Sequence, residues 1–588
     1  MRLKKPAVAL SAGALLALAA CGGSSSNGTP TVQSNTHIAS GGGAGAGKDP
    51  TRQPPAPAIP GAKKGGTLTV LSDASFTTVD PTEAYYTNVV GILSGLVVRS
   101  LTQYVYDPKT KGMILIPDLA TNLGVPNKNF TQWKFTIRKG VKFENGKTVT
   151  PADIKYGIER SFDRSTFPGG ATYSNAYFLD GNTYKGPYKT PGNYNGVTIS
   201  GQTITIKMAK PFPDMPYWGA FPAISPIPAG KASDPATYKN HPLSTGPYMF
   251  KSYTPGESLT LVKNPYWSAA TDPGRHQYVN EFDMSFTVDS AKIDQTMLAD
   301  SGAGQTTLSY DPVLSADYQK FSQDASDRLI VGSEPCTFIW YPDNRQITDI
   351  KVRQALAWAY PYQAAWAAGG YIAGVTRIAA SNVMPPGIPG RVPYNPLPGH
   401  KPGTTDPAKA KSILQADGKL GYTIKYPYDT DVPQSVDVKN VVESALKQAG
   451  FNPQPYASTS TNVSTQVTQN PKAPVNIRSS GWCSDWPSGT TWLPTEFQST
   501  NIAKDGFGAN YEAFSNKAVD ARINAIQLLP LSKQPAAWNA LDKEVQTKYF
   551  PIVVTGYGGV AMTRGSKVHG DLDDTTLGGP TWKDIWLS

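Results

Sequence analysis

The segment that decides the fold class runs from Trp133 to Phe162 and reads WKFTIRKGVKFENGKTVTPADIKYGIERSF. In its first part, apolar residues alternate with polar ones at Trp133, Phe135 and Ile137. This period of two is typical of a strand with one buried face. The segment therefore begins with a predicted strand.

The second part of the same segment predicts a helix. Thr150 is a good N-cap, Pro151 suits the first helical position, and Asp153 completes a capping box. The apolar residues that follow share one helical face, at Ile154, Ile158 and Phe162. A strand and a helix within thirty residues indicate a mixed fold.

Similar patterns recur on either side of this segment. Residues 197–199 and 204–208 alternate around a Ser-Gly-Gln turn and predict a hairpin. Helices are predicted after Asp349, after Asp406, and over 438–449, where Gly450 ends the pattern. No internal repeat is present. The mixture predicts an α/β or α+β architecture with long irregular connections.

The amino terminus has the pattern of a bacterial lipoprotein signal. An apolar run over 7–20, too short to span a bilayer, ends in small residues before Cys21 and follows the cationic residues Arg2, Lys4 and Lys5. Residues 1–20 are the expected signal peptide, and Cys21 the lipidated residue that anchors the protein outside the cell membrane. An ordinary signal peptide is the alternative; a transmembrane helix is disfavoured because polar residues 22–28 end the apolar run.

Residues 21–65 are expected to form a disordered tether. They contain no aromatic residue and are rich in Gly, Ser, Thr and Pro, so they bury too little apolar surface to offset their ordering entropy. Residues 53–60 are expected to be a stiffer, polyproline-like part. The remaining chain, roughly 500 residues, is too long for one core and predicts two or three lobes.

Charge and composition exclude several function classes. The formal net charge of +10 comes from dispersed Lys and Arg, part of it from the signal peptide. Without a basic stripe, an exported protein is not expected to bind nucleic acid; the charge favours solubility or contact with anionic lipid. The chain has five histidines, none close to another, and no Gly-x-Ser-x-Gly motif. We therefore expect no metal, no cofactor and no enzyme activity.

Two cysteines remain if Cys21 is acylated. Cys336 and Cys483 form an even pair in an oxidising compartment, where a disulfide is the default expectation. Two free buried thiols are the alternative.

Several motifs together resemble those of the bacterial extracellular solute-binding proteins of family 5, which deliver oligopeptides to ATP-driven importers. The segment 133–162 carries the most specific of them. The other matching stretches are 64–68 (KGGTL), 79–81 (VDP), 115–120 (LIPDLA), 244–248 (STGPY), 263–267 (KNPYW), 349–359 (DIKVRQALAWA) and 481–485 (GWCSD).

This resemblance implies a two-lobed α/β fold of the periplasmic-binding-protein type (type II, cluster C), with an extra domain in lobe one. The implied boundaries are 66–86, 215–335 and 553–588 for lobe I, 87–214 for the extra domain and 336–552 for lobe II. It also implies a monomer that captures oligopeptides by lobe closure and hands them to ABC permease and ATPase subunits.

The resemblance further implies a ligand site around Asp485, whose carboxylate would pair with the ligand's amino terminus. The backbone of Ser480, Gly481, Trp482 and Cys483 would hydrogen-bond the peptide like an added strand. Ser75, Phe76 and Thr77 would face it from the other lobe. Asp485 as a solvated or helix-capping acid, and Trp482 as a core aromatic, remain alternatives.

A disulfide between Cys336 and Cys483 would, by the same resemblance, brace the binding strand. No basic residue for a ligand's terminal carboxylate can be assigned from the sequence. Binding of another solute, such as an oligosaccharide or an opine, and a peptide-sensing role without transport remain open alternatives.

Overall fold

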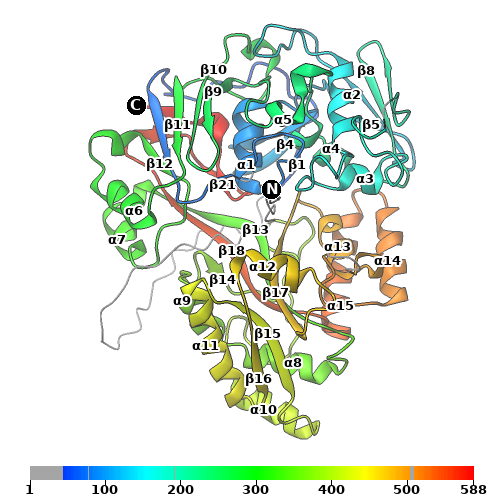
Figure 1. Cartoon of the computed structure of the whole chain (residues 1–588), viewed down its shortest axis with the longest axis vertical. Coiled ribbons are helices and arrows are strands. Elements are labelled where there is room, and N and C mark those ends of the chain that lie inside the picture. Colours follow the sequence, from blue (N-terminus) through cyan, green and yellow to red (C-terminus); the bar gives the residue numbers. More distant parts are fainter. Residues whose placement is uncertain (1–43, 77, 191, 503–508) are drawn as a thin grey trace, which may run out of the picture. The chain divides into compact units, whose positions relative to one another are not determined.

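The computed structural model describes residues 44–76, 78–190, 192–502 and 509–588. The described chain divides into two compact units, which we call unit 1 (Ser333–Gly559) and unit 2 (44–332 with Val560–Ser588) (Figure 1). The chain passes between them twice, within strands β13 (Leu329–Pro342) and β18 (Val553–Thr563). Residues 87–214 belong to unit 2, and their status as a separate domain stays a prediction.

Unit 2 is built on a five-stranded mixed sheet. Its strand order is β12 (Thr307–Ser309), β2 (Thr67–Leu71), β11 (Glu281–Ser285), β10 (Ser258–Lys263) and β9 (Tyr248–Thr254). The first three strands run parallel, and β11, β10 and β9 are antiparallel. Strand β2 alternates as its sequence suggests, because Leu68 and Val70 are fully buried in the core cluster on this sheet.

The strand and helix predicted in 133–162 are both confirmed. Strand β6 (Gln132–Thr136) lies in a four-stranded sheet with β5 (Val125–Pro126), β8 (Thr203–Lys207) and β7 (Val197–Ser200), in the order β5-β6-β8-β7. Helix α2 (Pro151–Arg160) begins at the predicted capping box. The backbone N–H and the hydroxyl of Thr150 both donate to Asp153, over 2.7 and 2.6 Å. The predicted hairpin is β7 and β8.

The expectation of a disordered tether over 21–65 is wrong for its described part. Strand β1 (Ala44–Lys48) pairs in parallel with β4 (Gly112–Pro117), which also pairs with β3 (Thr102–Asp107). Farther on, the backbone N–H of Ala56 donates to Asp272 O and that of Gly65 to Tyr278 O. Composition missed this because backbone groups of 44–65 pair with distant parts of unit 2, which no local pattern signals. Residues 1–43, including the expected signal peptide and Cys21, lie outside the described residues.

Unit 1 contains the four-stranded sheet that positions the candidate site. Its strand order is β14 (Arg377–Ile378), β18, β13 and β17 (Ile477–Cys483). A second, parallel pair consists of β15 (Thr423–Asp429) and β16 (Asn452–Ser458). Helices α8 (Ile350–Ala359), α10 (Pro407–Ala416) and α11 (Pro433–Gln448) share a core cluster with these strands.

The predicted helix starts in unit 1 are confirmed by their caps. Asp349 accepts the backbone N–H of Lys351, and Asp406 accepts that of Lys409.

A second core cluster involves α13 (Leu493–Phe497), α14 (Lys517–Gln527) and α15 (Gln534–Lys548). The other α-helices of at least five residues in the described chain are α1 (Thr87–Ile92), α3 (Tyr173–Tyr177), α6 (Ser290–Ala299), α7 (Tyr318–Asp324) and α9 (Tyr362–Ala368). Among the described residues, no helix combines the length and the apolar character that a membrane crossing needs.

Candidate functional site

The disulfide predicted between Cys336 and Cys483 is present, so the alternative of two free thiols is wrong. The two residues lie directly opposite each other on the antiparallel strands β13 and β17. The bond therefore fixes the last residue of β17 to the centre of the sheet.

Strand β17 is an edge strand. It pairs with β13 on one side, and no other strand of the described chain pairs with its second side. In an antiparallel pair, residues whose N–H and C=O turn toward the partner alternate with residues whose groups turn away. The register places Ser484 opposite Pro335, and Ser484 donates its backbone N–H to Pro335 O over 2.8 Å. Ser484 therefore turns toward β13.

Counting back from Ser484, the backbone groups of Cys483 and Gly481 turn away from β13, toward the open edge. Those of Trp482 and Ser480 turn toward β13 and belong to the ladder within the sheet. The backbone ladder expected over 480–483 is thereby limited to alternate residues. Cys483 and Gly481 are the two that can pair with an added strand.

Gly481 lets the ring of Phe338 lie directly against the edge strand. A Cβ at this position would lie 2.9 Å from Thr337 O and 3.1 Å from the ring of Phe338, which is opposite Gly481 in the register. A larger residue would displace the ring or the strand. Glycine at position 481 therefore allows Phe338 to pack against β17.

Asp485 follows the strand on a turn that tryptophans hold in place. Trp482 donates its indole N–H to Thr491 O over 2.7 Å, and Trp492 donates to the Ser484 hydroxyl over 2.6 Å. Trp492 is fully buried and Trp486 nearly so, so both are core aromatics, as expected for single tryptophans. Asp485 itself is half-buried between two buried neighbours, Ser484 and Trp486. Asp485 therefore lies two residues after Cys483, the last residue of β17.

Sequence reasoning missed a buried arginine, Arg377, and a nearby glutamate, Glu334. Arg377 stacks between two rings, with its guanidinium carbon 3.4 Å from the Phe338 centroid and 3.7 Å from that of Tyr371. Nearby, burial raises the pKa of Glu334 to about 7, and the charge of Arg377 opposes that rise. No local spacing signals this proximity, because only the fold brings β13 and β14 together, on either side of β18.

Two glycines of β18 make room for this pair. A Cβ at Gly556 would lie 2.8 Å from Cδ of Arg377, and a Cβ at Gly558 would lie 2.5 Å from a carboxylate oxygen of Glu334. Both glycines lie in the core strand, where any side chain would occupy the space of the charged pair.

The residues expected from the other lobe lie in unit 2, in the loop after β2. Ser75 is exposed, and Thr77 lies outside the described residues. The side chain of Phe76 is 6% exposed and packs against Phe286 at 4.6 Å between ring centroids. The Phe76 side chain therefore belongs to the core of unit 2, and a ligand contact by this segment stays a prediction.

A buried carboxyl group holds this loop. Asp311 accepts the backbone N–H of Asp73 over 2.6 Å and the hydroxyl of Ser72 over 2.8 Å. Burial, and next the charge of Asp73, raise the pKa of Asp311 to about 7. The loop that carries Ser75 is thus tied to the sheet of unit 2.

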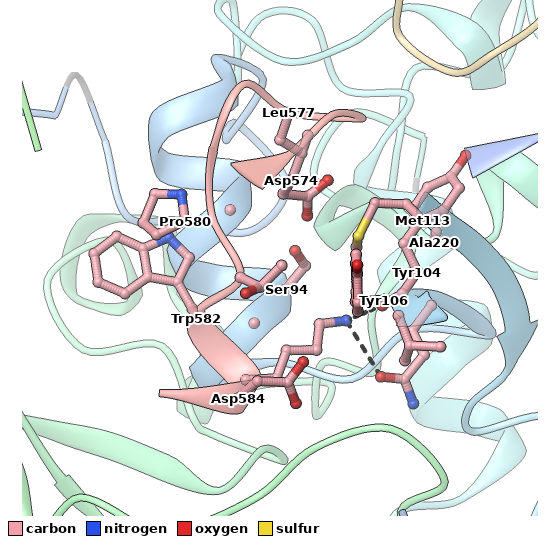
Figure 2. Close-up of a pocket in the computed structure, with 16 residues that line it drawn as sticks. Ser94, Tyr104, Tyr106, Met113, Ala220, Asp574, Leu577, Pro580, Trp582 and Asp584 are labelled. Atoms are coloured by element: carbon pink, nitrogen blue, oxygen red, sulfur yellow. Dashed lines mark hydrogen bonds between the residues drawn. The ribbon is translucent and has the colours of Figure 1, made fainter. Parts of the chain in front are cut away.

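Unit 2 also contains a cavity of about 30 Å³ beside Lys583 (Figure 2). The Lys583 ammonium donates to the side-chain oxygen of Gln103 over 3.3 Å and to the backbone oxygen of Tyr104. Burial lowers the pKa of Lys583 to about 8. The volume suits a water molecule or two rather than a solute. Within the described residues, no group of His, Cys, Asp and Glu side chains is arranged to hold a metal.

A larger groove, of about 780 Å³, lies on unit 1 between α9 and α11. Its lining is uncharged and includes Gln363, Asn440 and Gln448. It contains none of the residues expected to bind ligand.

Comparison with known proteins identifies the family to which this chain is similar. The family model for "Bacterial extracellular solute-binding proteins, family 5 Middle" matches residues 115–504. The chain belongs to this family. The periplasmic oligopeptide-binding protein OppA of Salmonella typhimurium is 24% identical over 237 residues, which cover 39% of this chain and 42% of OppA. The glutathione-binding protein GsiB of Salmonella paratyphi A is 24% identical over 521 residues, covering 83% and 88%.

Solved structures share the fold. The clavulanic acid biosynthesis oligopeptide binding protein 2 superposes with a TM-score of 0.82 at 21% identity, covering 93% of this chain and 99% of that protein. The protein DppA of Helicobacter pylori, in complex with the peptide STSA, has a TM-score of 0.67 at 17% identity, covering 89% and 98%. The expected two-lobed solute-binding fold is confirmed. These relatives are binding proteins, and family membership makes this chain an extracytoplasmic solute-binding protein.

Proposed function

We propose that this chain captures short peptides and delivers them to an ABC importer. The observation that carries the proposal is the open edge of β17, where Gly481 and Cys483 present backbone groups and Asp485 follows at the end of the strand.

An open edge of this kind suits a peptide because it recognises features that all peptides share. An extended peptide added to β17 would exchange backbone hydrogen bonds with Gly481 and Cys483, whatever its side chains are. Asp485 would pair with the terminal ammonium group, a charge-assisted contact that fixes which end of the peptide lies there. The disulfide holds the edge in place when the ligand leaves.

The relatives support a peptide rather than another solute. OppA and GsiB are named for oligopeptides and for glutathione, a tripeptide, and DppA was solved with a bound tetrapeptide. The same fold also binds other solutes, since the relative AgaA was solved with agropinic acid. The open backbone edge favours the peptide for this chain.

Membrane attachment through lipid on Cys21 and action as a monomer belong to the same proposal. A tethered binding protein stays close to its permease, and closure of two lobes around a ligand would give the permease a form to recognise. The β13 and β18 segments between the units are where the backbone would bend. No catalytic step is proposed.

Native mass spectrometry of freshly purified protein, followed by calorimetry with short peptides, tests this function. The expected result is a retained or titratable peptide bound one to one. Binding of an opine or an oligosaccharide with no response to any peptide would overturn the proposal.

A further inference from the structure

Residues 44–65, which we call the arm, lie on unit 2 and are held there mainly by hydrogen bonds. The backbone N–H groups of Asp49, Ala56 and Gly65 donate to carbonyl oxygens of unit 2 over 2.9 to 3.0 Å. From residue 47 to residue 65, no arm residue is buried. Little apolar surface therefore stabilises the docked arm, and the loss of one hydrogen bond should weaken its docking measurably.

His276 joins the middle of the arm to a short 3₁₀ helix (Trp582–Asp584). Its Nε2 lies 2.9 Å from the carbonyl oxygen of Pro57 in the arm. Its Nδ1 lies 3.1 Å from a carboxylate oxygen of Asp584 and 3.3 Å from the carbonyl oxygen of Lys583. The side chain of His276 is 12% exposed, so water has little access to replace a lost partner.

Tyr278, two residues farther on, extends the same contact. Its ring stacks on that of His276, with 4.9 Å between the centroids and 12° between the planes. Its hydroxyl accepts the backbone N–H of Ile59 over 3.3 Å, and its carbonyl oxygen accepts that of Gly65. His276 and Tyr278 together therefore hold the arm from Pro57 to Gly65.

The geometry around the His276 ring requires two ring protons. Carbonyl and carboxylate oxygens only accept hydrogen bonds, and the structure places one such oxygen at each ring nitrogen. A neutral imidazole carries a single N–H, whereas an imidazolium carries two. Only the protonated ring donates to Pro57 and Asp584 at the same time.

The charges around the ring favour this protonated state. Burial lowers the pKa of His276, but the hydrogen bond and the charge of Asp584, together with the Pro57 carbonyl, outweigh burial, so the pKa lies above its usual value. Among the described residues, Asp584 is the only charged side chain that pairs with His276. The other charged groups on these elements face elsewhere: Arg275 toward Asp118 and Asp272, Lys583 toward Gln103 and Tyr104, Arg52 toward Asp49, Lys63 toward His569 and Lys64 toward Lys263.

We propose that His276 is a proton-dependent clip that fastens the arm to unit 2. In the protonated state its ring donates to both Pro57 and Asp584. When the ring loses a proton, one of these contacts loses its donor and the arm is held more weakly. Because the pKa of the docked ring is raised, its stabilising contribution is complete below the pKa of a free histidine, about 6.5, and is lost as the pH rises through the pKa of the docked ring.

The clip would set how far the protein can extend from the membrane. This consequence rests on the proposed lipid anchor at Cys21, whereas the clip itself does not. Between Cys21 and a docked arm, residues 22–43 span at most about 75 Å; with the arm released, residues 22–65 span at most about 150 Å. Acidic pH would therefore hold the binding protein within a shorter distance of the membrane.

Hydrogen–deuterium exchange of the full chain in detergent, over a series from pH 5.5 to pH 7.5 and corrected for intrinsic exchange rates, tests the clip. Peptides that cover 49–65 report on the arm, and peptides from β2 and β11 of the same unit are the internal reference. Relative to that reference, protection of the arm in the wild type should fall by about tenfold across the series, as for one hydrogen bond from a charged donor.

Three variants assign the effect to the ring. His276→Gln carries no charge, so its arm should show the weak protection of high pH throughout. Asp584→Asn removes the carboxylate that raises the pKa of His276, so the loss of arm protection should occur at lower pH than in the wild type; a purely structural role would not move this midpoint. His241→Gln is the matched control and should respond as the wild type does, because His241 contacts Glu144 over 2.7 Å and lies against Phe250 rather than the arm.

The outcomes separate the clip from its consequence. Arm protection that does not change with pH in the wild type, or that falls as strongly in His276→Gln, would overturn the clip, as would an unchanged midpoint in Asp584→Asn. The wild type and Asp584→Asn decide the matter even if His276→Gln does not fold. If the clip is found but Cys21→Ser stays in the membrane fraction, the clip stands and only its effect on reach falls, together with the lipid anchor.

Discussion

At the scale of single residues, the disulfide ties the edge strand β17 covalently to its neighbour β13. Cys336 and Cys483 are 147 positions apart, and their bond closes that long loop in the unfolded chain as well as in the folded one. Such a cross-link stabilises mainly by restricting the unfolded state.

Breaking this bond should lower the free energy of unfolding by about 2 to 5 kcal/mol. Urea unfolding of the wild type with and without reductant, and of the Cys336→Ala/Cys483→Ala double variant, measures the effect. The double variant serves as the control, since reductant should not change its stability further. Equal stability of wild type and double variant would contradict a bracing role, as would recovery of both cysteines as free thiols in non-reduced peptide mapping.

The residue scale also shows what the sequence could and could not reveal about the site. Cys336, Cys483 and Asp485 lie in short motifs, so pattern and resemblance could find them. Arg377 lies in the two-residue strand β14, far from either motif, and its surroundings depend on Gly558 across the sheet and on the ring of Phe338. Contacts between distant strands leave no local spacing to read. For the same reason Phe76 was expected near the ligand, although its ring belongs to the core.

At the scale of elements, helix α13 and the segment before α14 each bury a carboxyl group. Glu496 of α13 and Glu512, which precedes α14, are fully buried, and Tyr341 of β13 is a neighbour of Glu496. Burial raises the pKa of Glu496 to about 8 and that of Glu512 well above its usual value, the latter with a contribution from the charge of Glu496. Both groups are therefore neutral in the folded protein at acidic pH.

This pair should make the protein less stable as the pH rises. In the unfolded chain a glutamate loses its proton near pH 4.5, whereas folded Glu496 keeps it until about pH 8. Its stabilising contribution is complete below pH 4.5 and is lost between these values, with a slope of about 1.4 kcal/mol per pH unit for one group. Urea unfolding of the wild type and of Glu496→Gln from pH 5 to pH 8 measures it.

Comparing the wild type with Glu496→Gln separates the pH dependence caused by Glu496 from that caused by other buried acids. The slope of the Glu496→Gln variant should be shallower, and the variant should gain stability relative to the wild type as the pH rises. A variant whose stability falls as steeply as that of the wild type would show that Glu496 is ionised in the folded protein.

Elements with a strong local sequence pattern could be predicted. Elements that form only by pairing with a distant part of the chain could not. The start of α2 follows from Thr150, Pro151 and Asp153 alone, because a capping box satisfies its own backbone groups. Strand β1 carries no such signal. Its Ala and Gly residues suit a flexible linker, and only pairing with β4 makes it a strand.

At the scale of the whole molecule, the fold class and the two-lobed division followed from the sequence because the family motifs are spread along most of the chain. The two chain crossings within β13 and β18 lie close to the boundaries that the resemblance implied. Attachment to the membrane through lipid on Cys21 stays a prediction, because Cys21 lies outside the described residues.

Replacing Cys21 by Ser should release the protein from the membrane without changing ligand binding. The lipid would be the anchor, and the ligand site lies hundreds of residues away in sequence. Fractionation of cells that produce each protein, followed by calorimetry on the released variant, measures both effects. Retention of Cys21→Ser in the membrane fraction at the wild-type level would contradict lipid anchoring.

The measurement that tests the central claim most directly is a calorimetric cycle on Asp485 and the ligand's amino group. Removing one member of a buried charge pair costs about 3 to 5 kcal/mol, so Asp485→Ala should weaken peptide binding on the order of a hundred- to a few thousandfold. N-acetylation of the peptide should do comparable damage to the wild type. The exposed acid Asp437 on α11 provides the control, because Asp437→Ala should bind as the wild type does.

The decisive quantity is the coupling between the two changes. If Asp485 holds the amino terminus, acetylation should cost far less affinity in Asp485→Ala than in the wild type. Fully additive losses, or an Asp485→Ala variant that binds peptide as tightly as the wild type, would contradict the account.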